Sequence, residues 1–236
     1  MLHLKNYAFI VFVLLGMTVN AQNNVIKAGL TGAFLGDINI GFEQRVSDKS
    51  SLQVKIGFLD PTLSPAVNED VITPKAYTLL EANGGISTSL EYRFYLSRKR
   101  GLQGFYVAPY LRYFNQKMLF DDEIEGYIFL VDSKLSTVGM GAQLGYQWII
   151  NEIFALDFFF FGTGADFHKA ELKYKLDPQP SGFDYSIVTP HVDDVFVDIN
   201  YLHSKLTHTV NEDNHNTKLP FLFPGFRAGI SIGVAF

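Results

Sequence analysis

The sequence contains no cysteine, so neither disulfide bonds nor thiolate metal sites contribute to its structure or chemistry. It also lacks an excess of positive charge, because 19 lysine and arginine residues stand against 24 aspartate and glutamate residues, a formal net charge of −5. This mildly acidic balance argues against nucleic acid as a partner. Beyond residue 21 there is no apolar run long enough for a transmembrane helix.

The first 21 residues have the pattern of a secretory signal peptide. Lys5 supplies a positive charge, and residues 7–17 form an apolar stretch that is short for a membrane-spanning helix. Val19 and Ala21 occupy the −3 and −1 positions of a cleavage site. We therefore expect cleavage after Ala21 and a mature domain over residues 22–236, with an uncleaved N-terminal anchor as the alternative.

The mature sequence is rich in aromatic residues and glycine, with 22 Phe, 12 Tyr and 20 Gly in the whole chain. An exported chain of this composition without a membrane helix is compatible with a secreted β-sandwich or with an outer-membrane β-barrel. The sandwich would use shorter strands and would bury its apolar faces in a core. The pattern along the chain decides between these two classes.

Apolar and polar residues alternate in several segments, as in the closing FRAGISIGVAF. Successive side chains of a strand face opposite sides, so each segment has one apolar face and one small or polar face. Their lengths suit strands that cross a bilayer at a tilt. The eight predicted strands cover residues 26–34, 37–43, 51–58, 86–96, 105–113, 137–148, 154–160 and 226–236. Within the fifth, Pro109 cannot donate to a strand ladder and predicts a bulge.

The polar faces carry charges of both signs, at Glu43, Arg45, Lys55, Glu91, Arg93, Arg112, Asp157 and Arg227. Unpaired buried charges are costly, so we expect these side chains to pair inside a barrel while the apolar faces meet lipid. Open sheet edges cannot lie in lipid, and the sheet must therefore close. The predicted fold is all-β, a closed antiparallel up-and-down eight-stranded transmembrane β-barrel.

The joins between the predicted strands alternate in length. Short joins are expected at 47–50, 97–102 and 150–152, and long joins at 60–85, 116–134 and 166–223, after a tight first hairpin at 35–37. Small outer-membrane barrels have short periplasmic turns and long outer loops. Both chain ends would then lie on the periplasmic side.

Several aromatic residues fall on the apolar face next to the short joins, at Phe94, Phe105, Tyr146, Trp148, Phe154 and Phe236. Aromatic residues favour strands in general, which is one explanation of their positions. Their clustering at one end of several strands favours an interfacial girdle instead. Phe236 would then lie in the girdle beside the first strand.

The closing PGFRAGISIGVAF, the strand GFYVAPYLRYF and the pair GAQLGYQWIINEIFALDFFFFGTGAD resemble a family of small outer-membrane β-barrel proteins of unknown function, with an architecture similar to the OmpA/OmpX type. This resemblance implies a location in the outer membrane of a Gram-negative cell, surrounded by lipid and lipopolysaccharide. It also implies insertion by the outer-membrane assembly machinery, because a terminal aromatic residue such as Phe236 is typical of the barrels delivered to that machinery. It transfers no catalytic residue, and we expect a monomer.

The predicted loop 166–223 is far longer than an ordinary connection. Within residues 191–208, Val192, Val195, Ile199, Leu202 and Leu206 have helical spacing and predict a short amphipathic helix. This helix would cap or enter the barrel mouth, or pack on its own loop. Five of the six histidines lie in the same loop, at His168, His191, His203, His208 and His215. Their spacing does not match a metal site, and we expect neither metal nor cofactor.

Three functions remain compatible with the sequence. A structural or surface-interaction role through the outer loops is favoured, because an eight-stranded barrel is just wide enough for side chains to fill its interior. A narrow channel or small-ligand barrel gated by residues 166–223 is the second. A lipid-A-modifying enzyme using His168 is the third, although the sequence holds no GxSxG, HExxH or complete Walker loop and we predict no catalytic activity.

Overall fold

The computed structural model describes residues 23–34, 36–60, 84–97, 101–178, 180 and 182–236. The predicted signal peptide therefore lies outside the described residues. The described elements are β1 (Asn24–Gly29), α2 (Leu30–Phe34), β2 (Asp37–Ser47), β3 (Ser50–Leu59), β4 (Gly85–Tyr95), β5 (Gly104–Ile124), β6 (Tyr127–Ile150), β7 (Phe154–Leu176), η3 (Tyr185–Ile187), α3 (Val188–Phe196), α4 (Asn200–His203), β8 (Thr207–Val210) and β9 (His215–Ala235). None of the helices in these ranges is long and apolar enough to cross a membrane.

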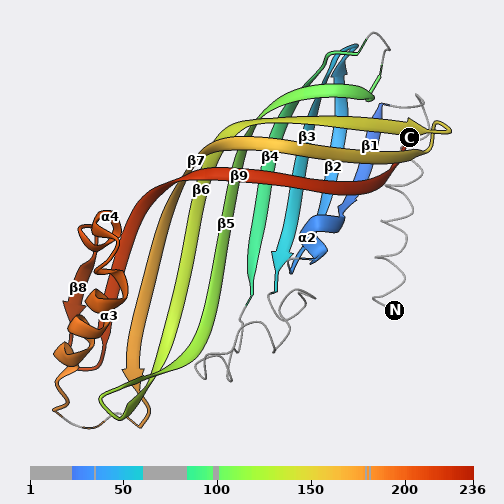
Figure 1. Ribbon diagram of the computed structural model, residues 1–236. Coiled ribbons are helices and arrows are strands. Elements are labelled where there is room, and N and C mark those ends of the chain that lie inside the picture. The colour runs from blue at the N-terminus through green and yellow to red at the C-terminus, as the bar shows by residue number, and fades with distance from the viewer. Residues whose placement is uncertain (1–22, 35, 61–83, 98–100, 179, 181) are drawn as a thin grey trace, which may run out of the picture.

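The strands form one antiparallel sheet in which β1 to β7 pair in chain order, β7 pairs next with β9, and β9 also pairs with β1. Hydrogen bonds therefore run in a ring through β1 to β7 and β9 (Figure 1). The backbone of Phe236 continues the closure, because it donates to Asn24 at 2.9 Å and accepts from Asn24 at 3.0 Å. The prediction of an antiparallel up-and-down sheet is confirmed. The sheet has nine strands, however, because β8 adds to β9 beside the ring.

Four strands extend far beyond the others on one side of the ring. β5, β6, β7 and β9 have 21 to 24 residues each, whereas β1 to β4 have 6 to 11. We call the part of these four strands that projects past β4 the wall; it is the long lobe of Figure 1. The ring and the wall are thus continuous, and the wall carries its own small core.

Two of the predicted long joins are wrong, because much of their length forms strands of the wall. Residues 116–134 form a continuous hairpin that turns at Glu125 and Gly126, whose φ angles are 52° and 82°. The predicted loop 166–223 is β7 up to Leu176 and β9 from His215 onward. These segments carry polar and charged residues on both faces, so they lack the apolar face by which the ring strands were identified. The third predicted long join consists largely of residues 61–83, outside the described residues.

The first predicted strand is also shorter than expected. β1 ends at Gly29, and residues 30–34 form the short helix α2. The close approach of Asn39 requires glycine at position 29, because a Cβ there would lie 2.2 Å from Asn39 Oδ1. On the other side, the Thr31 hydroxyl oxygen accepts a hydrogen bond from the Ile230 N–H at 2.9 Å. α2 thus takes the place of a strand beside β9.

Pro109 does not produce the predicted bulge. It pairs with Ala142 of β6, and the β4–β5 register is the same on either side of it, with two intervening pairs unformed. The missing N–H of proline therefore interrupts the ladder without shifting it. A bulge lies in β7 instead, where Leu144 pairs with Phe161 and Gly145 with Phe159. The additional residue, Phe160, remains on the outside of the ring and is 42% exposed.

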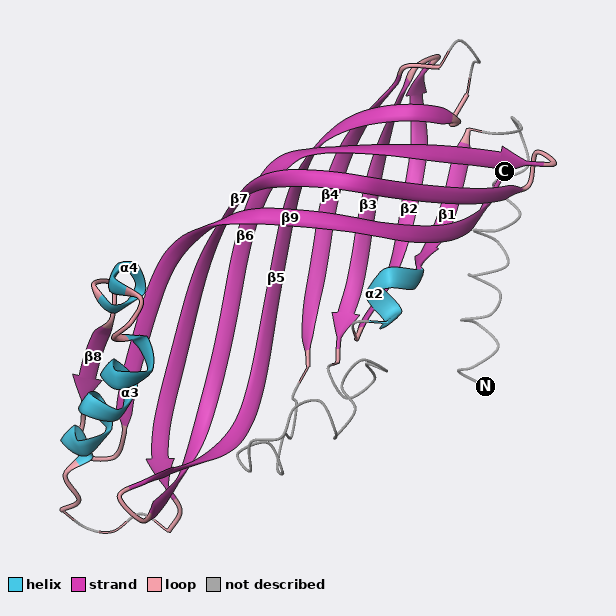
Figure 2. Ribbon diagram, in the orientation of Figure 1, coloured by secondary structure: helices cyan, strands magenta, loops and turns pink. Residues whose placement is uncertain are grey.

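Residues 182–214, which we call the cap, pack at the far end of the wall (Figure 2). Val188 and Val192 of α3 contact a cluster with Phe129, Val131 and Tyr174. The two β6 residues of this cluster lie on the same sheet face as the ring interior, because alternation along β6 is uninterrupted.

The cap contains helix where residues 191–208 predicted it, but in two pieces, α3 and α4. Of the predicted apolar positions, Val192 and Leu202 are buried, whereas Val195 and Ile199 are exposed. The helical segment therefore packs on the wall with part of its predicted face.

Candidate functional site

The interior of the ring is filled by charged side chains at the end that carries the short turns. Lys27 stands at the centre of this set. Its Nζ donates to Glu43 Oε2 at 2.5 Å and to Asp157 Oδ2 at 2.8 Å, so it joins β1, β2 and β7 across the interior. It also donates to the side-chain oxygens of Gln53 and Gln147. Lys27 is 2% exposed, and each of these contacts is therefore shielded from solvent.

Arg93 forms the second bridge of this interior. It donates to Glu91 Oε2 at 2.8 Å and lies 2.8 Å from Asp157 Oδ2, with Glu43 at 3.5 Å. Its guanidinium group stacks over the Tyr106 ring at 4.3 Å. All three carboxylates and Arg93 are 0% exposed. Such groups are stable in a dry interior only when they are paired and hydrogen-bonded, and these are.

Neutral side chains complete the hydrogen bonding of the three carboxylates. Tyr95 donates to Glu43 at 2.6 Å, and Tyr106 donates to Asp157 at 2.8 Å. Gln53 and Gln143 each donate to Glu91 at 3.0 Å. The interior at this level is therefore a continuous network of side chains.

Two further cations approach Glu91 from the other side. Lys55 Nζ lies 3.5 Å from Glu91 Oε1, and Arg227 Nη2 donates to the same oxygen at 3.2 Å. Glu91 thus pairs with three cations, counting Arg93. We call Lys27, Glu43, Lys55, Glu91, Arg93, Asp157 and Arg227 the ion-pair network.

The structure places six of the eight charges singled out in the sequence inside this network. Arg112 lies nearby but pairs separately, with Asp166 of β7. Arg45 differs from the prediction, because it lies at the β2–β3 turn and pairs with Asp48. Arg45 keeps the inward parity of Glu43 and pairs opposite Ser51, but it is so close to the turn that its side chain reaches the Ser47 carbonyl and Asp48 instead of the network. The predicted set of inward charges does not include Lys27. Its neighbours Ile26 and Ala28 face outward, and alternation along the strand therefore places Lys27 on the inner face.

The six aromatic residues predicted to form a girdle lie near the short-turn end of the ring. Phe94, Trp148 and Phe154 are exposed on the outer face, with exposed fractions of 43 to 58%. Tyr146 and Trp148 contact each other with ring centroids 4.3 Å apart, and Phe105 pairs opposite Tyr146 in the β5–β6 ladder. Phe236 lies beside β1 through its backbone hydrogen bonds with Asn24.

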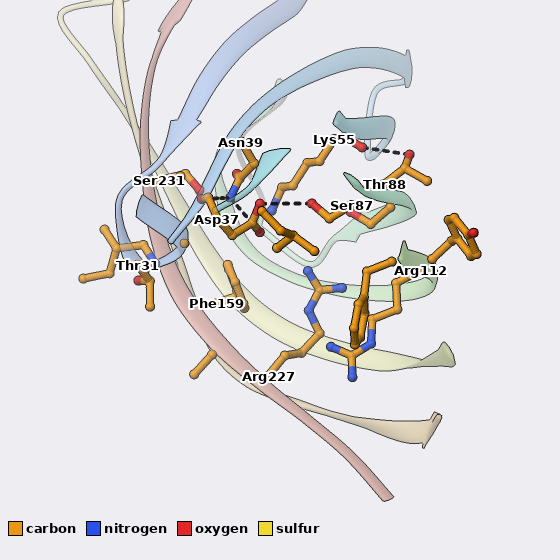
Figure 3. Close-up of a pocket in the computed structure, with 18 of the residues that line it drawn as sticks. Thr31, Asp37, Asn39, Lys55, Ser87, Thr88, Arg112, Phe159, Arg227 and Ser231 are labelled. Carbon is orange, nitrogen blue, oxygen red and sulfur yellow. Dashed lines mark hydrogen bonds between the residues drawn. The ribbon is translucent and has the colours of Figure 1, made fainter. Parts of the chain in front are cut away.

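A cavity of about 530 Å³ opens above the ion-pair network, on the side of the wall. Figure 3 shows Lys55, Arg112 and Arg227 projecting toward it, with Asp37 beside the end of the Lys55 side chain. The Asp37 carboxylate accepts hydrogen bonds from the Ser87 hydroxyl at 3.0 Å and from the Asn39 amide at 3.2 Å. The charged side chains that line the cavity are thus three cations and one carboxylate.

The cap holds a separate cluster of histidines. His208 Nδ1 lies 3.1 Å from His215 Nε2, and His208 Nε2 lies 3.1 Å from Asp193 Oδ1. The Thr217 hydroxyl lies within 3.1 Å of both imidazoles. Among the described residues, no three His, Asp or Glu side chains are arranged to hold a metal ion. The imidazoles serve instead as packing and hydrogen-bonding groups between the cap and the wall.

His168, the histidine considered for catalysis, is held by structural contacts. Its Nδ1 lies 2.7 Å from the Thr137 hydroxyl, and its ring stacks on Phe221 at 4.6 Å. Neither contact provides a carboxylate to orient the imidazole as a catalytic base. The geometry around His168 therefore gives no support to a nucleophilic mechanism.

Comparison with known proteins gives one match. Residues 7–178 match a protein family described as "Protein of unknown function (DUF3575)". The match ends just beyond β7, so the whole cap and β9 lie outside it. No curated protein and no solved structure matches the chain.

Proposed function

We propose that this chain, which belongs to the DUF3575 family of unknown function, is an integral outer-membrane β-barrel of the OmpA/OmpX type that does not conduct and presents its wall and cap to partners at the cell surface. The observation that carries the proposal is the contrast between the two faces of the ring. The outer face is apolar and exposed, whereas the inner face is charged and buried. This is the reverse of a soluble sandwich.

The outer face supports placement in lipid. Ile40, Ile56, Phe58 and Phe226 are 58 to 68% exposed, and they lie on strands from both sides of the β1–β9 closure. Soluble monomers rarely expose contiguous apolar surface of this extent. Spanning sheets must satisfy their backbone groups internally, and the ring of hydrogen bonds does so where β1 pairs with β9 over residues 231–235.

The arrangement of turns and ends supports an orientation. The short β2–β3 and β6–β7 turns, residue 24 and the C-terminus lie at one end of the ring, and the wall projects from the other (Figure 1). Small outer-membrane barrels keep short turns and both ends in the periplasm. The wall and the cap would then be the extracellular part.

The ion-pair network supports a closed interior. Lys27, Glu43, Arg93 and Asp157 are at most 2% exposed and contact one another across the ring. Water and ions passing through would have to displace several charge-assisted hydrogen bonds. A packed barrel is therefore a better account than the narrow channel considered from sequence.

The orientation can be tested with cysteine labelling, because the chain has no native cysteine. Glu212→Cys in the cap should react with a membrane-impermeant maleimide on intact cells. Lys49→Cys in the β2–β3 turn is the matched exposed control and should react only after the outer membrane is permeabilised. Equal labelling of both in intact cells, or recovery of the protein in the soluble fraction, would contradict the proposal.

Closure can be tested with the refolded mature chain in planar bilayers. A folded barrel should migrate faster on gels before boiling than after, which establishes that the sample is folded. We expect no discrete conductance from the folded protein. Stable conductance steps would replace the surface-interaction role with a channel function.

A further inference from the structure

The ring has an opening in its side between α2 and the wall. One edge of β9 pairs with β1 only over residues 231–235 and with β8 only over residues 215–218. Between these two stretches, residues 219–230 have no strand partner on this edge in the part of the chain that the structure describes. The Ile230 N–H is bound by the Thr31 hydroxyl and the Leu222 N–H by the Tyr201 hydroxyl. Side chains, not a strand, therefore border this opening.

The cavity above the ion-pair network reaches this opening. It is lined by Arg227 and Ser231 from the inner face of β9, and also by Phe226, Ala228 and Ile230 from its outer face. Alternate residues of a strand face opposite sides. The cavity therefore extends along the edge of β9 at this opening.

The inner end of this cavity favours an anion. Glu91 is shared among Lys55, Arg93 and Arg227, and the ion-pair network as a whole has four cations for three carboxylates. Arg227 lines the cavity, and Glu91 engages only its Nη2, while Nη1 has no hydrogen-bond partner among the described residues. Buried guanidinium N–H groups are normally satisfied, and an oxyanion is the acceptor that suits them best.

An aromatic ring also holds Arg227 in place, because its guanidinium lies 4.5 Å from the centre of the Tyr110 ring. Asp37 of β2 also lines the cavity and opposes an anion, but the lining still holds three cations against this one carboxylate. Arg112 is paired with Asp166, so Lys55 and Arg227 are the two cations of the cavity lining that also contact Glu91.

The outer end of the cavity is apolar. Phe226 is 68% exposed and Ile230 38% exposed at the opening, and Leu30 of α2 lies exposed on the adjoining surface. A volume of about 530 Å³ is also within the usual range of small-molecule sites. The site therefore has a cationic end inside the ring and an apolar end outside it.

We infer that this cavity binds a single-chain amphiphilic anion, a lipid with a carboxylate or phosphate head, with the head at Arg227 and the hydrocarbon chain leaving through the side opening. The inference rests on the proposed membrane placement, because the hydrocarbon chain of the ligand leaves toward lipid. It gives the protein a lipid-binding function in addition to the proposed surface interaction.

The test is displacement of a fluorescent C18 carboxylate from the folded mature protein in non-ionic micelles. We expect saturable binding that dodecanoate or dodecyl phosphate displaces and dodecanol does not. Stronger displacement by dodecanoate identifies a free fatty acid, and stronger displacement by dodecyl phosphate identifies a phosphate-headed lipid. Absence of saturable binding, or equal displacement by dodecanol, would overturn the inference.

Two variants locate the ligand. Arg227→Gln should weaken binding at least tenfold, whereas Arg45→Gln at the distant turn should leave it unchanged. Ala228→Trp should obstruct the opening and also weaken binding, whereas Ala142→Trp on the outer face of β6 should not. Unchanged affinity in folded Arg227→Gln would overturn the site. If Arg227→Gln does not fold, unchanged affinity in folded Ala228→Trp would overturn it instead.

Gel mobility before boiling separates this inference from the proposed function. A wild-type protein that shows the mobility shift but no binding refutes the lipid site and leaves the barrel. A protein that shows no shift and does not enter the membrane fraction refutes the proposed function itself.

Discussion

Lys27 of β1 donates a hydrogen bond to Asp157 of β7 at 2.8 Å across the interior of the ring. The two residues are separated by 130 positions in the chain, and neither is exposed by more than 2%. The same ammonium group binds Glu43. One cation thus holds two carboxylates together in the dry interior, and its loss should be felt by both.

Lys27→Met should lower the free energy of unfolding by about 3 kcal/mol, because it leaves Glu43 and Asp157 with fewer compensating charges in a buried site. Urea titration of the refolded protein in vesicles, followed by gel mobility before boiling, measures this change. Arg45→Met is the control. The Arg45–Asp48 pair lies at a solvent-facing turn, and its loss should cost no more than about 1 kcal/mol. Similar losses in the two variants would mean that Lys27 has no special role.

The pairing of Lys27 with Asp157 also predicts non-additivity. Asp157→Asn alone should destabilise the protein, because Lys27 and Arg93 lose a buried anion. In the Lys27→Met/Asp157→Asn double variant both partners of one buried pair are removed together, so the loss should be smaller than the sum by about 1–3 kcal/mol. A double-mutant cycle in the same urea assay gives this coupling energy. Strict additivity would show that the two residues do not interact in the folded protein.

The sequence predicts the ring strands well because each has one uniformly apolar face. In the wall this signal is lost. Lys117 pairs with Lys134 on one face and Asp122 with Phe129 on the other, so neither face is apolar throughout. Alternation alone therefore reads the wall as loop, although the two-residue turn at Glu125 and Gly126 permits a continuous hairpin.

The sequence predicts only part of the candidate site, because alternation along a strand gives the face of a side chain and not its contacts. Strand parity identifies which charges face inward. Glu91 and Arg93, for example, are two residues apart on β4, face the interior together and form an ion pair. Parity does not identify the partners of the inward charges or the neutral groups between them, which depend on the register of strands distant in the chain. The side opening at β9 was not predictable, because it arises from where β1 ends and α2 begins.

The cap should be separable from the ring in stability. Val192 is 1% exposed in the cluster with Phe129 and Tyr174, and Val192→Asp would bury an unpaired carboxylate there. We expect cleavage within residues 182–214 to become at least tenfold faster in limited proteolysis, with the gel mobility shift of the ring retained. Val195→Asp, at a position 64% exposed on the same helix, should behave as wild type. Loss of the mobility shift in Val192→Asp would mean that the ring depends on the cap.

The histidines between cap and wall predict a dependence on pH. Burial, reinforced by the neighbouring His208, holds the pKa of His215 below its usual value. Because the folded-state pKa lies below the unfolded value of about 6.5, the undocked chain binds the proton more readily between the two values. Docking of the cap is therefore most stable above about pH 6.5 and weakens as the pH falls below it.

Hydrogen exchange of cap amides at pH 7.5 and pH 5.0, corrected for intrinsic rates, measures this dependence. We expect the wild-type cap to lose protection several-fold at the lower pH, while amides of the ring keep theirs. His215→Gln should remove most of the difference, because the buried titrating group is gone. His203→Gln should keep it, since His203 is partly exposed and lies 3.8 Å from Asp193 at the edge of the cluster. A pH response that persists in His215→Gln would assign the dependence to another group.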